Sequence, residues 1–180
     1  MVPTIHRAKP SDVEQLSYVC SRTFIDTYGQ SLGSHQAAMA REYVKETFSI
    51  DALRRELAAE SGETWIAVVD TTIAGYVKIG DDHPPEVVAP KNLINLDRLY
   101  VLKEHHGAGL GRLLLATAES RAKERGAGGI WLGVWEENAA AIAFYARHGY
   151  TKVGRRTWEY VRDGIQYRDF DDIMVKAIQR

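Results

Sequence analysis

The sequence predicts one α/β domain over residues 1–180, built on a single mixed sheet with helices on both faces. Three observations support this prediction. A chain of 180 residues is long enough to bury one core without cross-links. Apolar residues recur at helical spacing in the first third, and β-branched runs separated by turn residues follow. Between residues 93 and 135, a strand, a glycine turn, a helix and a second strand succeed one another, which is typical of a parallel crossover.

The first third is expected to contain one strand and three helices. The strand covers residues 4–8, because the Lys-Pro-Ser-Asp segment that follows it supplies a turn and a helix cap. Gly29 and Gly33 interrupt the first helical pattern, and two further helices are expected over 36–48 and 51–59. The apolar face of the first helix comprises Val13, Leu16, Val19, Cys20 and Phe24.

Two hairpins flank the expected crossover. Residues 64–70 and 73–79 are β-branched runs separated by a short polar turn. Residues 152–160 and 167–176 form a second pair of strands, joined around an Asp-Gly turn. Both pairs are expected to be antiparallel because each connection is short.

The crossover runs from a strand over 93–102 to a second strand over 130–135. The helix between them follows the glycine turn and ends at Gly126, and a last helix over 138–148 is stopped by Gly149. The residues expected to share the inner face of the crossover helix are Leu110, Leu113, Leu114 and Ala118.

The charge balance and the cysteine content exclude several classes of protein. Lys and Arg number 23 against 24 Asp and Glu, so the chain has no field that would collect nucleic acid or an anionic membrane. The single cysteine, Cys20, excludes an intramolecular disulfide framework. No run approaches the ~20 apolar residues of a membrane span, and the first residues do not begin a signal peptide. A small-molecule partner and a cytoplasmic location are therefore expected.

No metal site is expected. Apart from His106, the histidines lack the spacing to a partner acid or cysteine that a metal site needs, and they are interpreted as surface or packing residues. They are His6, His35, His83, His105 and His148.

A glycine-spaced turn, Gly107, Gly109 and Gly111, precedes the crossover helix. Without Cβ atoms, these residues let backbone N–H groups turn toward one point at a helix N-terminus, where the dipole favours an anion such as a phosphate. An ordinary tight strand-to-helix turn is the alternative. A Walker loop is excluded, because Arg112 and Leu113 stand where that motif needs Lys and Ser or Thr. A dinucleotide fingerprint is excluded as well, because its third glycine would fall on Arg112.

Further along the chain lies the run Asn138-Ala-Ala-Ala-Ile-Ala-Phe-Tyr-Ala-Arg-His-Gly-Tyr150. Together with the turn His106-Gly-Ala-Gly-Leu-Gly111, it resembles the GNAT family of N-acetyltransferases over roughly residues 60–176. The family pattern has Arg or Gln where this chain has His106. The resemblance implies a mostly antiparallel, twisted sheet whose central parallel strands are splayed for coenzyme A. It also implies acetyl-CoA as the cosubstrate, and a homodimer is a common state of such domains.

By the same resemblance, each part of acetyl-CoA has an expected partner. The backbone from Gly107 to Arg112 would hold the pyrophosphate, and the main chain from Leu99 to Val101 would pair with the pantetheine. Asn138 would bond the pantetheine, Ala141 would leave room for it, and Tyr145 would lie by the thioester sulfur. The cofactor-binding residues implied in this way are Leu99, Tyr100, Val101, His106, Gly107, Ala108, Gly109, Leu110, Gly111, Arg112, Asn138, Ala141 and Tyr145.

Four segments resemble one subgroup more closely, the PaiA type of GNAT enzymes, which acetylate spermidine and spermine. These segments are 23–27, 74–78, 96–101 and 130–136. The resemblance implies an acetyl-CoA-dependent N-acetyltransferase that acts on a primary amine, with polyamines such as spermidine or spermine first among its substrates. Two alternatives stay open, namely transfer to a peptide or protein amine and a coenzyme A-binding regulatory protein with little turnover.

Acetyl transfer to an amine requires a base, because an alkyl ammonium with a pKa near that of lysine, about 10.4, stays protonated at neutral pH. Asp97 is the expected base. Asn95 and Asp97 alternate onto the strand face that also carries Val101, which points Asp97 toward the approach of the amine. Asn95 is expected to orient a water molecule. An ion pair between Asp97 and a neighbouring residue is the alternative.

Tyr145 is the expected acid that protonates the leaving thiolate. A tyrosine pKa of about 10 exceeds a thiol pKa of about 8.5, so this proton transfer is uphill by only ~2 kcal/mol. The alternative for Tyr145 is packing in the core against Ile142. By resemblance, the Val101 N–H would donate to the developing oxyanion, and such a donor is typically worth about 3 kcal/mol.

Acidic residues are the expected attraction for a polycationic acceptor. Those in the N-terminal helices are Asp26, Glu42 and Glu46, and those in the loop before the strand over 93–102 are Asp81, Asp82 and Glu86. Trp135, together with Trp131, is a candidate wall of the acceptor cleft. The alternatives are a solvated surface for the acids and core packing for the aromatic rings.

His106 predicts a pH dependence. Arg and Gln donate hydrogen bonds at every pH, whereas histidine is shorter and loses its charge as the pH rises across neutrality. Coenzyme A is therefore expected to bind more weakly at higher pH, unless only backbone contacts hold it.

Overall fold

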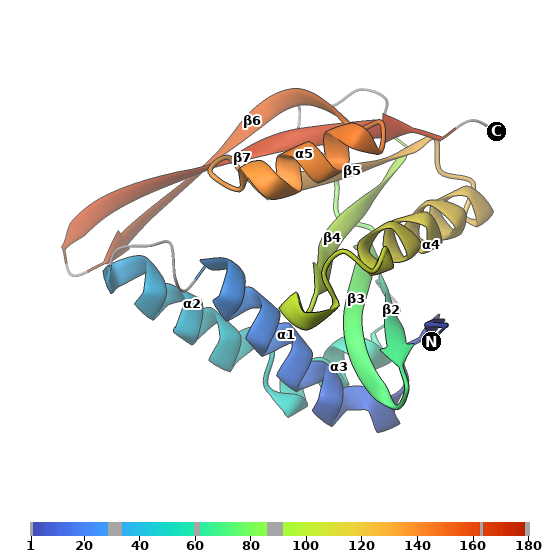
Figure 1. Cartoon of the computed structure of the whole chain (residues 1–180). Coiled ribbons are helices and arrows are strands. Elements are labelled where there is room, and N and C mark those ends of the chain that lie inside the picture. The colour runs from blue at the N-terminus through green and yellow to red at the C-terminus, as the bar shows by residue number, and fades with distance from the viewer. Residues whose placement is uncertain (1, 29–33, 60–61, 86–91, 163, 179–180) are drawn as a thin grey trace. The chain divides into compact units, whose positions relative to one another are not determined.

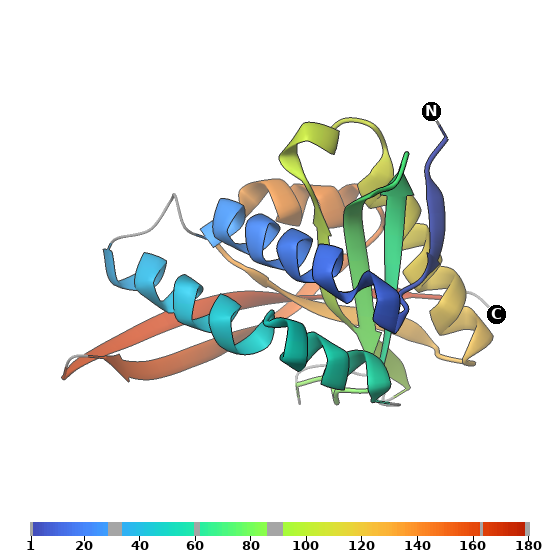
Figure 2. The ribbon, with the colours of Figure 1, turned by 90° about the horizontal axis from the view of Figure 1, so that it is seen from below.

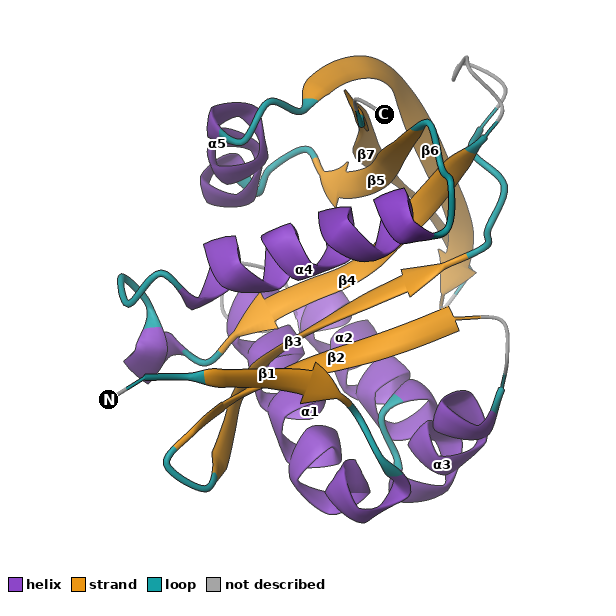
Figure 3. Cartoon of the chain, turned by 90° about the vertical axis from the view of Figure 1, so that its right-hand side faces the viewer, coloured by secondary structure: helices purple, strands orange, loops and turns teal. Residues whose placement is uncertain are grey.

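The computed structural model describes residues 2–28, 34–59, 62–85, 92–162 and 164–178. Its helices and strands follow the predicted order and are labelled in Figure 1, except for β1, which is labelled in Figure 3. The elements are β1 (Thr4–Arg7), α1 (Val13–Tyr28), α2 (Ser34–Thr47), α3 (Ile50–Ala58), β2 (Gly62–Val69), β3 (Thr72–Gly80), β4 (Leu93–Val101), α4 (Leu110–Glu124), β5 (Gly129–Trp135), α5 (Ala139–Arg147), β6 (Thr151–Arg162) and β7 (Ile165–Ala177), with 3-10 turns at Pro10–Asp12 and Lys103–His105. The interruption expected at Gly29 and Gly33, and Asp163 of the expected Asp-Gly turn, lie outside the described residues.

The chain divides into two compact units, and β4 contributes to both. Unit 1 comprises Met1–Gly80 and Arg98–Ala118, and unit 2 comprises Asp81–Asp97 and Glu119–Arg180. The strand order is β1-β2-β3-β4-β5-β7-β6. β4 and β5 pair in parallel, whereas the β1–β2, β2–β3, β5–β7 and β6–β7 pairs are antiparallel. The expected mixed, mostly antiparallel sheet is therefore confirmed.

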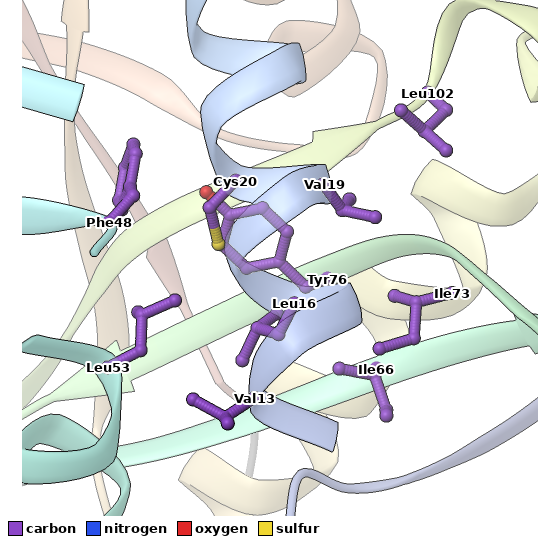
Figure 4. Packing of buried hydrophobic residues seen from close by; sticks show 10 residues of the cluster. All are labelled: Val13, Leu16, Val19, Cys20, Phe48, Leu53, Ile66, Ile73, Tyr76 and Leu102. Atoms are coloured by element: carbon purple, nitrogen blue, oxygen red, sulfur yellow. The ribbon is translucent and has the colours of Figure 1, made fainter. Parts of the chain in front are cut away.

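In unit 1, helices pack on one face of the first strands. Figure 3 shows β1, β2 and β3 side by side with α1 and α3 behind them, and Figure 2 shows α2 leading into α3 beside α1. The predicted inner face of α1 is confirmed, with Leu16 and Val19 almost fully buried against Ile66 and Tyr76 (Figure 4). Burying one such aliphatic side chain contributes about 1.5–3 kcal/mol, so this face holds α1 on the sheet.

Cys20 lies in the same core beside Tyr76 (Figure 4), and its burial raises the pKa of the thiol from 9.0 to about 12. The folded state therefore favours the neutral thiol, and this contribution is complete below pH 9.0 and is lost as the pH rises toward 12. We expect the unfolding free energy to fall across this window by up to ~1.4 kcal/mol per pH unit more in the parent than in Cys20→Ala. Urea unfolding of both proteins at several alkaline pH values measures the two slopes, and equal slopes would contradict the expectation.

Unit 2 is built on β5, β7 and β6. Even-numbered residues of β5, such as Ile130 and Leu132, are buried, and Trp131 packs on the other face with Leu93 and Ile173. β6 and β7 pair from Thr151 to the turn, so this hairpin is longer than the sequence predicts. The predicted helix over 138–148 is α5, and Asn138 is its N-cap.

The predicted inner face of α4 is wrong at one position. Leu113 is 43% exposed, whereas Leu115 is 1% exposed. A helix advances about 100° per residue, so Leu113 falls on the far side of the stripe that the other buried residues define. That stripe comprises Leu110, Leu114, Leu115, Ala118 and Ala122.

Candidate functional site

The glycine turn presents backbone amides at the start of α4. Gly107 and Gly109 have φ values of 79° and 80°, which favour glycine, and a Cβ on either would meet no atom within 4 Å. The backbone conformation, rather than space, therefore requires glycine here. The first bond of α4 runs from the Leu113 N–H to the Gly109 carbonyl at 3.1 Å. Gly111 already lies within α4, so it does not shape the turn as the sequence suggested.

This arrangement suits an anion. The N–H groups that precede the first intrahelical bond, those of Leu110, Gly111 and Arg112, have no partner within the helix. The helix dipole adds positive potential at the same point. Ala108 is exposed between the two left-handed glycines, so the turn is open to a ligand such as a pyrophosphate.

His106 binds the end of β4. Its Nε2 lies 2.8 Å from the Val101 carbonyl oxygen, and because a carbonyl only accepts, Nε2 donates the proton. In the neutral ring, Nδ1 then carries a lone pair, whereas the imidazolium offers a second N–H.

Because the sequence predicts that the ring contributes to coenzyme A binding, the parent is expected to bind coenzyme A more weakly at pH 8 than at pH 6. The guanidinium of His106→Arg donates hydrogen bonds at both pH values, so its dissociation constant should change little. Calorimetry on both proteins at the two pH values measures this. Identical pH profiles would dismiss a role of the ring in cofactor binding.

Alternate residues at the end of β4 pack toward α3 and the core of unit 1. The Arg98 guanidinium donates to Glu56 at 2.7 Å, and the Lys78 ammonium donates to the same carboxylate at 2.9 Å. The Tyr100 ring stacks on Tyr76 with centroids 5.8 Å apart. By strand alternation, Leu99 and Val101 therefore point to the opposite face. The Tyr100 side chain is thus a packing residue, and its carbonyl oxygen lies next to Gly75 of β3.

Asp97 and Asn95 lie in the part of β4 that belongs to unit 2. Asp97 is exposed, between buried Leu96 and half-buried Arg98. Asn95 is 5% exposed, and its side-chain amide donates to the Trp131 carbonyl at 3.4 Å. The parallel β4–β5 register ends with this Asn95–Trp131 pair.

α5 holds the remaining expected cofactor residues. The Asn138 side-chain oxygen accepts from the Ala141 N–H at 3.1 Å, which caps the helix. This bond leaves the side-chain NH₂ of Asn138 pointing away from the helix as a donor. Tyr145 is 7% exposed, and its ring meets Phe144 and Tyr150 edge-on at 5.3 and 5.6 Å.

Sequence reasoning missed a polar group beside Tyr145. Burial raises the pKa of the Tyr150 hydroxyl, and the neighbouring Glu119 carboxylate adds to this effect. Lys176 donates to both oxygens of Glu119 at 2.8 Å, and its ammonium lies 5.7 Å from the Tyr150 ring centroid. Tyr150 ends the run over residues 138–150, but only the packed structure brings it next to Glu119 on α4 and Lys176 on β7.

The acidic residues of the N-terminal helices differ in their surroundings. Asp26 is 12% exposed and pairs with Arg22 at 3.1 Å and with Lys103 at 3.6 Å, so two cations offset its charge. Glu42 and Glu46 are exposed on α2.

The structure also describes Asp81 and Asp82 of the loop before β4 and both candidate tryptophans. Asp81 pairs with Arg125, and Glu86 lies outside the described residues. Trp131 is a core residue, 3% exposed, and donates to the Asp82 carbonyl at 3.2 Å. Trp135 is half-buried at the end of β5 and remains a candidate wall.

Among the described residues, no group of His, Cys, Asp and Glu has the arrangement that holds a metal ion. None of the described helices is long and apolar enough to cross a membrane.

Comparison with known proteins supplies the family. Residues 30–150 match the model of the acetyltransferase (GNAT) family. An uncharacterised N-acetyltransferase from the pepI 3′ region of Lactobacillus delbrueckii subsp. lactis is 30% identical over 175 residues, which cover 97% of this chain and 96% of that protein. The spermidine N(1)-acetyltransferase of Thermoplasma acidophilum is 25% identical over 150 residues, which cover 81% of this chain and 86% of that protein.

A solved structure agrees in fold. The PaiA N-acetyltransferase of Thermoplasma acidophilum, in complex with coenzyme A, superposes with a TM-score of 0.76 at 22% identity, over 98% of this chain and 99% of that one. The matched family model, the relatives and the sheet order agree. The chain therefore belongs to the acetyltransferase (GNAT) family and is an acetyl-CoA-dependent N-acetyltransferase.

Proposed function

We propose that this enzyme transfers the acetyl group of acetyl-CoA to a primary amine of a polyamine such as spermidine or spermine. The observation that carries the proposal is the left-handed pair Gly107 and Gly109 at the start of α4, because it presents amides to a pyrophosphate. The likeness to a spermidine acetyltransferase supports a polyamine as the acceptor.

In this proposal, main-chain groups hold most of the cofactor. The amides of Leu110 to Arg112 bind the pyrophosphate, and the backbone of Leu99 to Val101 pairs with the pantetheine as an added strand would. The free NH₂ of Asn138 donates to a pantetheine carbonyl, since its oxygen already caps α5. Ala141, with its short side chain, leaves room for the pantetheine.

Asp97 acts as the base that removes the ammonium proton, directly or through a water molecule that Asn95 orients. Its exposure, in a strand whose preceding residues are buried, supports this role because an acceptor can reach it. The neutral amine attacks the thioester carbonyl, and the Val101 N–H stabilises the oxyanion by about 3 kcal/mol. As the intermediate collapses, the C–S bond breaks and Tyr145 protonates the departing thiolate. The nitrogen releases its remaining excess proton to water, which restores the Tyr145 hydroxyl, and the amide product and coenzyme A leave.

Thiol release from acetyl-CoA against a panel of amines tests the proposal. The panel holds spermidine, spermine, free amino acids, aminoglycosides and lysine peptides. Saturation by spermidine at micromolar to low millimolar concentration is the expected result, within the usual range of Michaelis constants. Activity confined to peptides would favour peptide or protein acetylation, and coenzyme A binding without turnover of any amine would favour a regulatory protein.

Three further properties belong to the same proposal. The chain forms one domain over residues 1–180, resides in the cytoplasm and assembles as a homodimer. Light scattering coupled to size-exclusion chromatography measures the assembly, and a single cooperative unfolding transition is expected for one domain.

A further inference from the structure

One face of the unit 2 sheet carries an aromatic and charged cluster around Trp135, the candidate wall of the acceptor cleft. In antiparallel strands, residues directly opposite each other point to the same face. Trp135 lies opposite Asp171, Asp171 lies opposite Arg156, and Trp158 lies opposite Asp169. These five residues therefore share one face of the sheet, the Trp135 face, which comprises Trp135, Arg156, Trp158, Asp169 and Asp171.

Asp171 is the centre of this face. Its Oδ2 accepts from the Trp158 indole N–H at 2.7 Å and from the Arg156 guanidinium at 3.1 Å. The same guanidinium stacks over the Trp158 ring, 4.2 Å from its centroid. A cation thus lies between a carboxylate and the face of an indole, the arrangement that best binds an alkylammonium.

Next to Asp171, β5 presents backbone without a side chain, at Gly133. Gly133 is exposed in the middle of β5, although the residues on either side of it are buried. A Cβ on Gly133 would lie 3.1 Å from the Arg156 guanidinium and 3.2 Å from the Asp171 carboxylate. Glycine therefore keeps open the space where a ligand would approach both charged groups.

The Arg156 guanidinium, which occupies the place between Asp171 and the Trp158 ring, is incompletely hydrogen-bonded. The Arg156 side chain is 35% exposed, and its buried Nε has no hydrogen-bond partner among the described residues. A partly exposed ion pair of this kind is weak and exchanges easily. Among the five residues that define the face, two are carboxylates, Asp169 and Asp171, and one is a guanidinium, Arg156. The Tyr160 hydroxyl donates to Asp169 at 2.7 Å.

We propose that the Trp135 face binds a second ammonium group of the acceptor, which displaces Arg156 from Asp171. This inference rests on the proposed function and adds the subsite that selects a polyamine over a monoamine. The incoming ammonium takes the place of the guanidinium between Asp171 and the Trp158 ring. Asp169 and Asp171, two residues apart on β7, lie ~7 Å apart along the strand, which suits ammonium groups joined by a short alkyl chain.

Two substitutions test the subsite in opposite directions. Asp171→Asn keeps an acceptor for the Trp158 indole but removes the charge, so KM for spermidine should rise about tenfold with little change in kcat. Arg156→Ala removes the competing cation, so KM for spermidine should fall. Butylamine has no second ammonium, and its KM should be unchanged in both variants.

Glu159→Gln is the matched control. Glu159 lies opposite Arg168 on the same hairpin, but its position in the alternation places it on the other face. Glu159→Gln removes one negative charge, as Asp171→Asn does, but KM for spermidine should not change in this variant. A similar rise in KM for this control would reduce the effect to general electrostatic attraction and overturn the proposal. An equal effect of Asp171→Asn on spermidine and butylamine would overturn it too.

Titration of spermidine into the protein saturated with coenzyme A separates this inference from the proposed function. If the parent binds spermidine and Asp171→Asn weakens that binding, the subsite is supported. This holds even if no acetyl group is transferred to spermidine, a result that would contradict the proposed function alone. If the parent binds no spermidine, the subsite is overturned, whichever amine is acetylated. Arg156→Ala keeps both carboxylates and supplies the decisive comparison should Asp171→Asn fail to fold.

Discussion

Replacing Tyr145 with phenylalanine is expected to lower kcat about 100-fold or more, because the thiolate then leaves without a positioned proton donor. The ring itself is retained, so its edge-on contacts with Phe144 and Tyr150 persist. The dissociation constant for coenzyme A should therefore stay within about twofold of the parent value. Steady-state rates and calorimetry measure the two quantities on the same preparation.

Tyr18→Phe is the control for this substitution. Tyr18 is 60% exposed on α1, so the loss of its hydroxyl should leave both the rate and the affinity unchanged. Full activity of Tyr145→Phe would remove Tyr145 from the chemistry and leave it as a packing residue. A loss of cofactor affinity in step with the rate would assign it to binding instead.

Replacing Asp97 with asparagine is the second substitution with a large expected effect. At neutral pH the acceptor arrives as an ammonium ion, and without a base kcat/KM should fall about 100-fold or more. The deficit should shrink as the pH rises toward the amine pKa of about 10, because free amine then needs no base. A pH profile of kcat/KM for spermidine measures this recovery.

Asp51→Asn provides the comparison for Asp97→Asn. Its side chain is 80% exposed at the start of α3 and forms an ion pair with Arg54 of the same helix, so its loss should alter no rate. A deficit of Asp97→Asn that stays constant from pH 7 to pH 10 would argue that Asp97 shapes β4 rather than accepting a proton.

Local patterns were sufficient to predict the turn and the helices that carry the proposed cofactor residues. Gly107 and Gly109 need left-handed backbone, and Asn138 caps the helix it precedes, so both signals lie within a few residues of the structure they determine. The two hairpins and the parallel crossover followed from the same local information together with the length of the connections, whereas the position of β7 between β5 and β6 was not predicted.

Signals that depend on distant parts of the chain were not predictable in this way. The charge of Asp26 is offset by Lys103, which lies far along the sequence. Tyr150 meets Glu119 and Lys176 only because α4 and β7 pack beside it. Leu113 was assigned to the wrong side of α4, because Leu113 and Leu115 lie about 100° to either side of Leu114 and spacing alone does not decide which of them is buried.

The buried thiol has a practical consequence for spectroscopy. Since Cys20 is the only cysteine of the chain and is 1% exposed, a fluorophore with a maleimide group would find no target on the native surface. Val161→Cys, at a position 70% exposed near the tip of the β6–β7 hairpin, would then be labelled alone. Such a probe, read by its emission during titration with an amine, would follow the hairpin in solution without a second dye site to remove.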